Sequence, residues 1–268
     1  MADTSLIETL DRRAVEKEAS RHTRKARFSR QLGALSIPVL VIAVLMHRSG
    51  VIDTNTMLAA MALSAVLAAI SILLAVAAVA TVGRYGLRGL SSAGLGMLYG
   101  ICVLALPLWA SIVYFEKPAI NDITTSPLNP PAFVELAGSN GQPPRPYDRS
   151  RAPVQRTAYP SVVPLRAAFT PETVFEIASE IVMERGWQVV EEIAPANGMA
   201  GRIEAVATTM IVGFKDDIVI IVDYEGAQSR TDMRSRSRFG EHDFGANAKR
   251  IDQFLSELAT KLTALPIE

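Results

Sequence analysis

Three long apolar runs lie within the first 115 residues, and they limit the fold of this chain more than any other feature. They cover residues 32–46, 57–82 and 93–115, and none of them contains a charged side chain. A helix rises about 1.5 Å per residue, so about 20 apolar residues cross a hydrocarbon core of about 30 Å. The second and third runs are long enough to cross a bilayer as helices. The sequence therefore predicts an α-helical membrane anchor over residues 32–115.

The first run is the shortest and leaves two possibilities. Its 15 residues reach about 22 Å as a helix. Counting from Phe28 lengthens it, provided that the side chain of Arg30 extends to the lipid headgroups. The run is then either a full span or a segment that lies in the interface.

Basic residues next to the runs predict the orientation. Residues 1–31 carry eight Lys/Arg, and the loop before the third run carries Arg84 and Arg88, whereas the loop after the first run has only Arg48. Lys and Arg concentrate in cytoplasmic loops. Three transmembrane helices thus give a basic cytoplasmic head and an extracytoplasmic chain after Phe115. An interfacial first run would place the basic head outside, which favours three spans.

The runs also bear on function. Ionisable side chains inside a membrane usually mark ion or substrate paths, and their absence here argues against a channel or transporter. Gly96 and Gly100 have a small-xxx-small spacing, which serves either packing among the three helices or a homo-oligomer formed through the membrane helices. The lipid bilayer is the first expected partner. A membrane assembly factor that acts through its helices is one alternative function.

Residues 116–164 contain ten of the 15 prolines. Proline is excluded from helix interiors and central strands, so we expect an extended linker over most of this segment. Apolar groups at residues 130–133 and 158–160 predict that parts of the linker pack on the following domain.

Residues 165–268 predict a small α+β domain of helix, four antiparallel strands and helix. Thr170-Pro171 is typical of a helix start and Gly186 of its end. Four β-rich runs follow, and Asn197-Gly198 is typical of a tight hairpin turn. Their ranges are a strand from Trp187 and strands over about residues 201–212, 217–224 and 230–238. A last amphipathic helix begins at about Ala246, and we expect both helices to cover one face of the sheet.

Strand alternation sorts the side chains onto two faces. Ile218, Ile220 and Val222 should lie under the helices, with Asp217 on the opposite face. If the connecting hairpin has an even number of residues, Arg234 and Arg236 share the face of Asp217, and one of them pairs with it.

The polar residues that stand out are Asp216, Asp217, Arg234, Arg236, Asp243 and Arg250. Guanidinium groups on one sheet face bind carboxylates or phosphates in a fork geometry. This set therefore predicts one of two arrangements. The first is a binding site for an anionic ligand or an envelope protein partner. The second is an ion-pair network in which Asp217 neutralises an arginine and Asp243 caps the last helix.

Signals for chemistry are weak. The single cysteine, Cys102, lies in the third run, and no His, Cys or acidic residues have metal-ligand spacing, so we expect no metal and no cofactor. Ser237, His242 and Asp243 lack a nucleophile motif. A hydrolase that uses Asp216, Asp217, His242 and Asp243 remains an alternative. Residues 116–268 carry 16 basic and 21 acidic residues, which argues against nucleic acid as a partner.

Several ordered motifs resemble the bacterial domain of unknown function 1499 (DUF1499) family over about residues 120–262. They are Tyr159-Pro160, Gly186-Trp187 and residues 201–205, 214–217, 234–238, 243–247 and 250–251. The resemblance implies an envelope protein, here a multi-pass protein of the bacterial inner (cytoplasmic) membrane, with no established reaction. The preferred hypothesis is a non-catalytic envelope protein whose extracytoplasmic domain binds through the face that carries Arg234 and Arg236.

Overall fold

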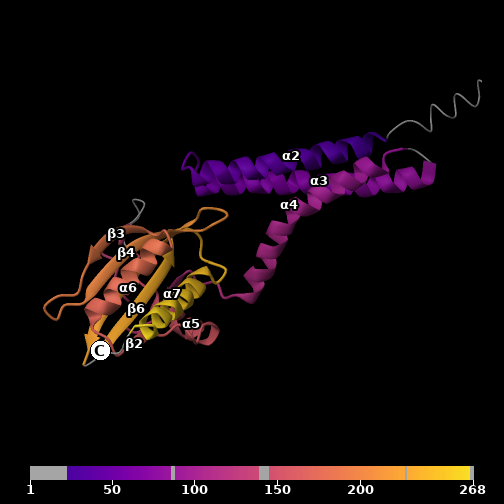
Figure 1. Ribbon diagram of the computed structural model, residues 1–268. Coiled ribbons are helices and arrows are strands. Elements are labelled where there is room, and N and C mark those ends of the chain that lie inside the picture. Colours follow the sequence, from indigo (N-terminus) through magenta and orange to yellow (C-terminus); the bar gives the residue numbers. More distant parts are fainter. Residues whose placement is uncertain (1–22, 86–87, 139–144, 227, 266–268) are drawn as a thin grey trace, which may run out of the picture. The chain divides into compact units, whose positions relative to one another are not determined.

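The computed structural model describes residues 23–85, 88–138, 145–226 and 228–265. The chain divides into two compact units, Met1–Ser111 and Ile112–Glu268. The first is helical, and the second contains the sheet (Figure 1). Most of the predicted basic head, residues 1–22, lies outside the described residues.

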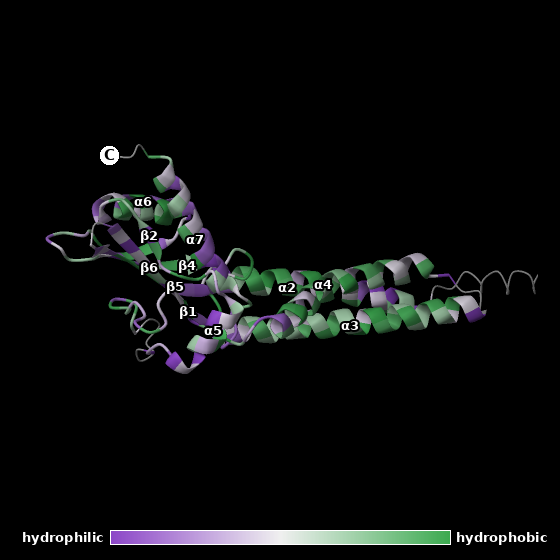
Figure 2. Ribbon diagram, turned by 90° about the horizontal axis from the view of Figure 1, so that it is seen from below, coloured by the Kyte–Doolittle hydropathy of each residue, from purple (hydrophilic) through white to green (hydrophobic). Residues whose placement is uncertain are grey.

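Three long helices confirm the predicted anchor. They are α2 (Arg24–Arg48), α3 (Thr54–Tyr85) and α4 (Leu90–Glu116). With 25, 32 and 27 residues they are about 37, 48 and 40 Å long. Each is long and apolar enough to cross a membrane, and hydrophobic residues run along the length of all three helices (Figure 2). The first unit contains all of them except the last turn of α4, which belongs to the second unit.

The first helix is longer than its apolar run. Thr23 caps it, because its Oγ1 accepts a hydrogen bond from the N–H of Ala26 at 3.0 Å. The last basic residues of the predicted head therefore form the first turns of α2. The helix gains the length that the apolar run alone lacks.

Small residues hold the three helices close together. The hydroxyl of Ser71 on α3 lies 2.7 Å from the carbonyl oxygen of Ser29 on α2 and 2.9 Å from that of Gly96 on α4. A Cβ at Gly96 would lie 2.0 Å from Ser29 Oγ, and one at Gly100 would lie 2.7 Å from Ile72 Cγ1. The Gly96/Gly100 pair is thus used for packing within the anchor, which is one of its two predicted roles.

The second unit contains an antiparallel sheet with the order β1-β6-β5-β4-β3, and β2 also pairs with β6. Helices α6 (Pro171–Glu184) and α7 (Ala246–Thr263) cover one face (Figure 1). The predicted α+β fold is confirmed. The strands are β1 (Asp122–Thr124), β2 (Leu165–Ala167), β3 (Gln188–Ile193), β4 (Gly201–Thr208), β5 (Lys215–Glu225) and β6 (Gln228–Ser237).

Local sequence signals explain most element ends. Thr170 Oγ1 accepts from the N–H of Thr173, and Pro171 occupies the first turn of α6. Asn197 and Gly198 both have positive φ, 54° and 78°, as the hairpin turn requires. Strand β4 ends before its predicted end, because residues 209–214 close a loop of their own.

The predicted linker contributes regular structure to the domain, which the prediction of an extended chain and four strands omitted. Strand β1 lies within it and pairs with β6, and it also contains η2 (Arg149–Arg151) and α5 (Ala152–Ala158). Three-residue strands such as β1 and β2 are too short to show alternation. We refer to residues 126–138 as the cover, because Phe133 and Leu136 pack there on Val206 and Val219 of the sheet.

The main core lies between the sheet and its helices. Ile218, Ile220 and Val222 of β5 are fully buried against residues such as Val174 on α6 and Phe254 on α7. The predicted division of β5 into two faces is therefore confirmed, and the second face carries the polar residues of interest.

Candidate functional site

Four arginines, from β6 and the residue that follows it, project from the sheet face opposite the helices. We call Arg230, Arg234, Arg236 and Arg238 the arginine ladder. Strand alternation places them on one face, while Met233 and Ser235 between them point to the helices. Arg234 and Arg236 are each only 4% exposed, so the centre of the ladder is buried.

Asp217 is the acidic centre of the ladder. It lies opposite Arg236 in the register of β5 and β6, which decides between the two predicted pairings. Its Oδ2 is 2.8 Å from Arg236 Nη2 and its Oδ1 is 2.6 Å from Arg238 Nε, and the carboxylate is 0% exposed. Two charge-assisted hydrogen bonds therefore compensate for the burial of this carboxylate.

Arg234 binds a carboxylate that the prediction did not include. Its Nε and Nη2 donate to the two oxygens of Asp122 on β1, at 2.9 and 2.7 Å, in a fork geometry. Its Nη1 donates to the carbonyl oxygen of Pro131 at 3.0 Å. One guanidinium group thus fastens both the short edge strand and the cover to β6.

The cover lies directly on the ladder. The ring of Phe133 is 4.9 Å from the guanidinium carbon of Arg234 and 4.5 Å from that of Arg236, within the range of cation–π attraction. The fully buried carboxylate of Glu204 on β4 accepts from the backbone N–H groups of Val134 at 2.6 Å and Leu136 at 2.8 Å. A charged group thus anchors the backbone of the cover to the sheet.

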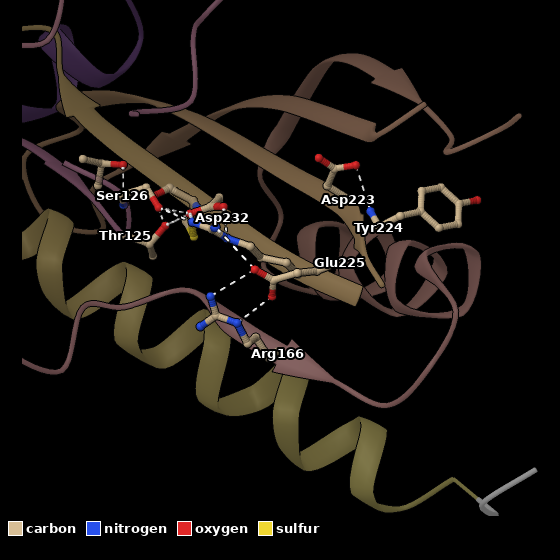
Figure 3. A network of polar contacts seen from close by, with 10 residues as sticks. Thr125, Ser126, Arg166, Asp223, Tyr224, Glu225 and Asp232 are labelled. Carbon is tan, nitrogen blue, oxygen red and sulfur yellow. Dashed lines mark hydrogen bonds and ion pairs between the residues drawn. The ribbon is translucent and has the colours of Figure 1, made fainter. Parts of the chain in front are cut away.

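The ladder continues in a more exposed network at the other end of β6 (Figure 3). Arg230 Nε lies 2.8 Å from Asp232 Oδ2, and Thr125 Oγ1 donates to Asp232 Oδ1 at 2.8 Å. Arg166 on β2 pairs with Glu225 at 2.6 Å. Each arginine of the ladder therefore has an acidic partner within the domain.

The helix-covered face holds a second polar group. Arg250 on α7 binds Asp216 at 2.5 Å and also donates to Ser235 Oγ and Asn247 Oδ1. Asp243 accepts from the N–H groups of Gly245 and Asn247, both at 2.9 Å. Asp243 thus caps the start of α7, as the ion-pair alternative predicted.

The six predicted site residues do not form one constellation, because Asp216 and Asp217 are neighbours in a strand and point to opposite faces. The structure brings Asp217 and Arg236 together, with Arg234 beside them, and separately places Asp216, Asp243 and Arg250 under α7. The geometry favours the ion-pair network over an open anion site. Burial raises the pKa of Asp243, and the hydrogen bonds from Asn247 and Gly245 oppose that shift only in part.

His242 uses both of its ring nitrogens inside the fold. The N–H of Phe244 donates to Nδ1 at 2.9 Å, so the proton of the neutral ring is on Nε2. That nitrogen lies 3.2 and 3.0 Å from the carbonyl oxygens of Tyr114 and Lys117. Ser237 Oγ accepts instead from Asn247 Nδ2 at 2.9 Å. The contacts of these two side chains are therefore structural ones, and they do not join Ser237 to His242.

One protein family matches the part of the chain that contains the ladder, the cover and the polar group under α7. The family described as protein of unknown function (DUF1499) matches residues 122–258, just over half of the chain. The chain belongs to this family. The match begins at Asp122, the partner of Arg234, so the DUF1499 domain includes β1 and the cover as well as both helices. No curated protein and no solved structure matches the chain.

Beside the ladder, the DUF1499 domain has a pocket of about 180 Å³. Its lining mixes Arg145 and Arg151 with Asp122, Asp148 and Glu241, so it has no single sign of charge that would select an anion. Burial raises the pKa of its Tyr147 to about 12. Among the described residues no group of three or more His, Cys, Asp or Glu side chains could hold a metal ion.

Two acidic residues of the DUF1499 domain, Glu204 and Asp122, have roles that only the structure reveals. Glu204 carries a signal, because it interrupts the apolar run from Ile203 to Ala207 on a strand that is buried on both faces. Asp122 carries none, because it lies in a proline-rich segment with no strand pattern. Their partners, the cover and Arg234, are far away in the sequence.

Proposed function

We propose that this DUF1499 protein is a multi-pass protein of the bacterial inner membrane with a non-catalytic binding or scaffolding role in the cell envelope. Its N-terminus is cytoplasmic and its DUF1499 domain extracytoplasmic. The three apolar helices support the membrane assignment, and the Lys and Arg residues next to them support the orientation.

The observation that carries the non-catalytic assignment is that the candidate carboxylates are already engaged. Asp217 contacts Arg236 and Arg238, Asp216 contacts Arg250, and Asp243 caps α7. A general base or nucleophile must reach the reacting group of a substrate. Carboxylates that are buried in ion pairs and caps instead give the domain a rigid shape.

The outer surface of the cover is the proposed contact with an envelope protein. Arg234 and Arg236 lie beneath it and hold it in place, so a partner meets the cover and not the guanidinium groups. The cover exposes Leu128 and Val134, which are 79% and 49% accessible. Exposed apolar side chains on an ordered segment favour contact with another protein surface.

The test is photocrosslinking in living cells, with full-length protein that carries a photoreactive residue at position 128. The matched control places the same residue at position 183, since Met183 on α6 is 65% exposed but lies away from the cover. We expect one defined adduct from position 128, none from position 183, and loss of the adduct in Val134→Asp. Equal labelling from both positions would contradict the proposed contact.

A separate measurement addresses catalysis. The purified full-length protein is assayed against ester, phosphoester, peptide and glycoside substrates, with and without divalent metal ions. We expect no turnover above that of Asp243→Asn. Turnover that Asp243→Asn abolishes while the fold is retained would establish the hydrolase alternative instead.

A further inference from the structure

Large apolar side chains gather at one end of the sheet in the DUF1499 domain. Met210 and Ile211, in the loop between β4 and β5, are 91% and 66% exposed, and Phe239 and Phe244, in the loop before α7, are about 40% exposed. Phe115, at the end of α4, is 87% exposed. We call these five residues the apolar rim.

The two loops of the rim form one ordered end of the sheet (Figure 1). The N–H of Thr209 donates to the carbonyl oxygen of Phe214, and the N–H of Phe214 donates to Thr209 Oγ1, both at 2.8 Å. The ring of Phe214 stacks on that of Phe239 at 6.1 Å. These contacts fix the conformation of the two loops. The exposure of Met210 and Ile211 is therefore a consequence of how the loop between β4 and β5 folds.

The rim also lies next to the point where α4 ends. The ring of His242 stacks on that of Tyr114 at 4.7 Å, and its Nε2 lies 3.0 Å from the carbonyl oxygen of Lys117. The side-chain amide of Asn121 donates to the carbonyl oxygen of Gly240. From Phe115 to Asn121 the chain advances six residues, which reach at most about 20 Å. The loop before α7, which Asn121 contacts, therefore cannot lie far from the end of the apolar span.

From these contacts we propose that the apolar rim rests in the interfacial layer of the bilayer that α4 leaves, and that the DUF1499 domain thereby binds lipid directly. This inference goes beyond the proposed envelope role and depends only on α4 being a span. Segments that lie in the membrane interface bury Phe, Trp and Leu side chains at the boundary between headgroups and acyl chains. The exposed Lys117 and Lys215 beside the rim supply ammonium groups for lipid phosphates.

The covalent tether favours lipid as the occupant of the rim over a diffusing partner. Because α4 holds the domain at the bilayer, the lipid surface is present at a high effective concentration. Shallow insertion of a few side chains, too weak to recruit a free protein, is enough to orient a tethered one.

The experiment places an environment-sensitive fluorophore (NBD) at single cysteines of the full-length protein in lipid nanodiscs. Cys102 is first replaced by alanine. Met210→Cys reports on the rim, and Met199→Cys is the matched control. Met199 is also exposed, at 66%, and lies in the hairpin at the opposite end of β4, about 26 Å away over eight residues.

We expect the probe at position 210 to shift to the blue, to brighten several-fold and to be quenched by lipids that carry a nitroxide near the headgroup. The probe at position 199 should behave as in water. Ile211→Asp, with the probe kept at position 210, should reduce the lipid quenching several-fold.

Two results would overturn the proposal. A water-like signal at position 210 would show that the rim faces solvent. A shielded probe that nitroxide lipids do not quench would show that protein covers the rim, either the anchor or a second copy. Since both probes replace exposed methionines, circular dichroism of the two variants should match that of the parent.

Discussion

Asp217 and Arg236 face each other across strands β5 and β6 and meet at 2.8 Å in a position closed to solvent. Arg238 approaches the other oxygen of the same carboxylate at 2.6 Å. A buried carboxylate between two guanidinium groups contributes less through net attraction than through the penalty that follows when one member is removed. The network therefore holds the sheet and the cover in one arrangement.

Asp217→Asn tests this network directly. The amide leaves the buried guanidinium group of Arg236 and the partly buried one of Arg238 without their counter-charge. We expect a loss of about 3–5 kcal/mol in the free energy of unfolding. Urea unfolding of the full-length protein in detergent, followed by tryptophan fluorescence, measures it, because Trp187 packs on Phe254 in the core of the domain.

Asp223→Asn is the matched control for that measurement. Asp223 lies on the same strand but is exposed, so its loss should change stability by less than about 0.5 kcal/mol. Equal effects of the two variants would show that the buried ion pairs do not hold the domain together.

Glu204→Gln tests how the cover is attached. Both carboxylate oxygens of Glu204 accept backbone N–H groups, from Val134 and Leu136, and a glutamine offers only one acceptor oxygen. We expect faster amide hydrogen exchange at one or both of these residues, while exchange in α6 stays unchanged. Glu191→Gln, on the edge strand β3, is the control and should leave the cover protected.

The helices and the four long strands of this fold are predictable because each has a local signature. Thr170-Pro171 and Asn197-Gly198 mark an element end and a turn by their own conformational preferences. The pairing of Asp217 with an arginine follows from strand alternation. Strand β1 and the cover are different, because Asp122 and Phe133 contact arginines of the ladder that are more than 100 residues away in the sequence.

Contacts between residues far apart in the sequence also explain why the sequence predicted that the arginines could bind a ligand. Alternation places Arg234 and Arg236 on the face away from the helices, but it does not reveal that a proline-rich segment covers that face. Prolines disfavour helix interiors and central strands, but they do not prevent close packing. The sequence thus predicts which face carries the charge, and only the tertiary structure shows that this face is closed.

Tyr159→Phe tests a buried hydroxyl that has no hydrogen-bond partner among the described residues. Its removal should leave stability at pH 7 unchanged or raise it by about 1 kcal/mol, because an unsatisfied polar group is lost. A loss of more than about 1 kcal/mol would show that the hydroxyl does have a partner.

The same variant predicts a difference at alkaline pH. Burial, followed by the charge of Asp243, raises the pKa of Tyr159 from 10.0 to about 12. A raised pKa means that the folded state favours the neutral phenol. The resulting contribution to the free energy of unfolding is complete below pH 10 and is lost as the pH rises toward 12. Between these pH values, the free energy of unfolding should fall more steeply with pH for the parent than for Tyr159→Phe. Parallel plots of this free energy against pH for the two proteins would contradict the raised pKa.

Gly96→Ala tests the packing of the membrane anchor against a control two residues away. A Cβ at Gly96 would lie 2.7 and 2.8 Å from backbone atoms of Ser29 and Arg30, whereas one at Gly94 would meet nothing within 4 Å. Backbone atoms in a packed helix pair cannot move aside cheaply, so we expect Gly96→Ala to destabilise the anchor by about 1–3 kcal/mol. Gly94→Ala should be neutral or slightly stabilising, because alanine favours a helix more than glycine does. Thermal unfolding in lipid-containing micelles compares the two, and equal midpoints would show that α4 does not pack closely on α2 at Gly96.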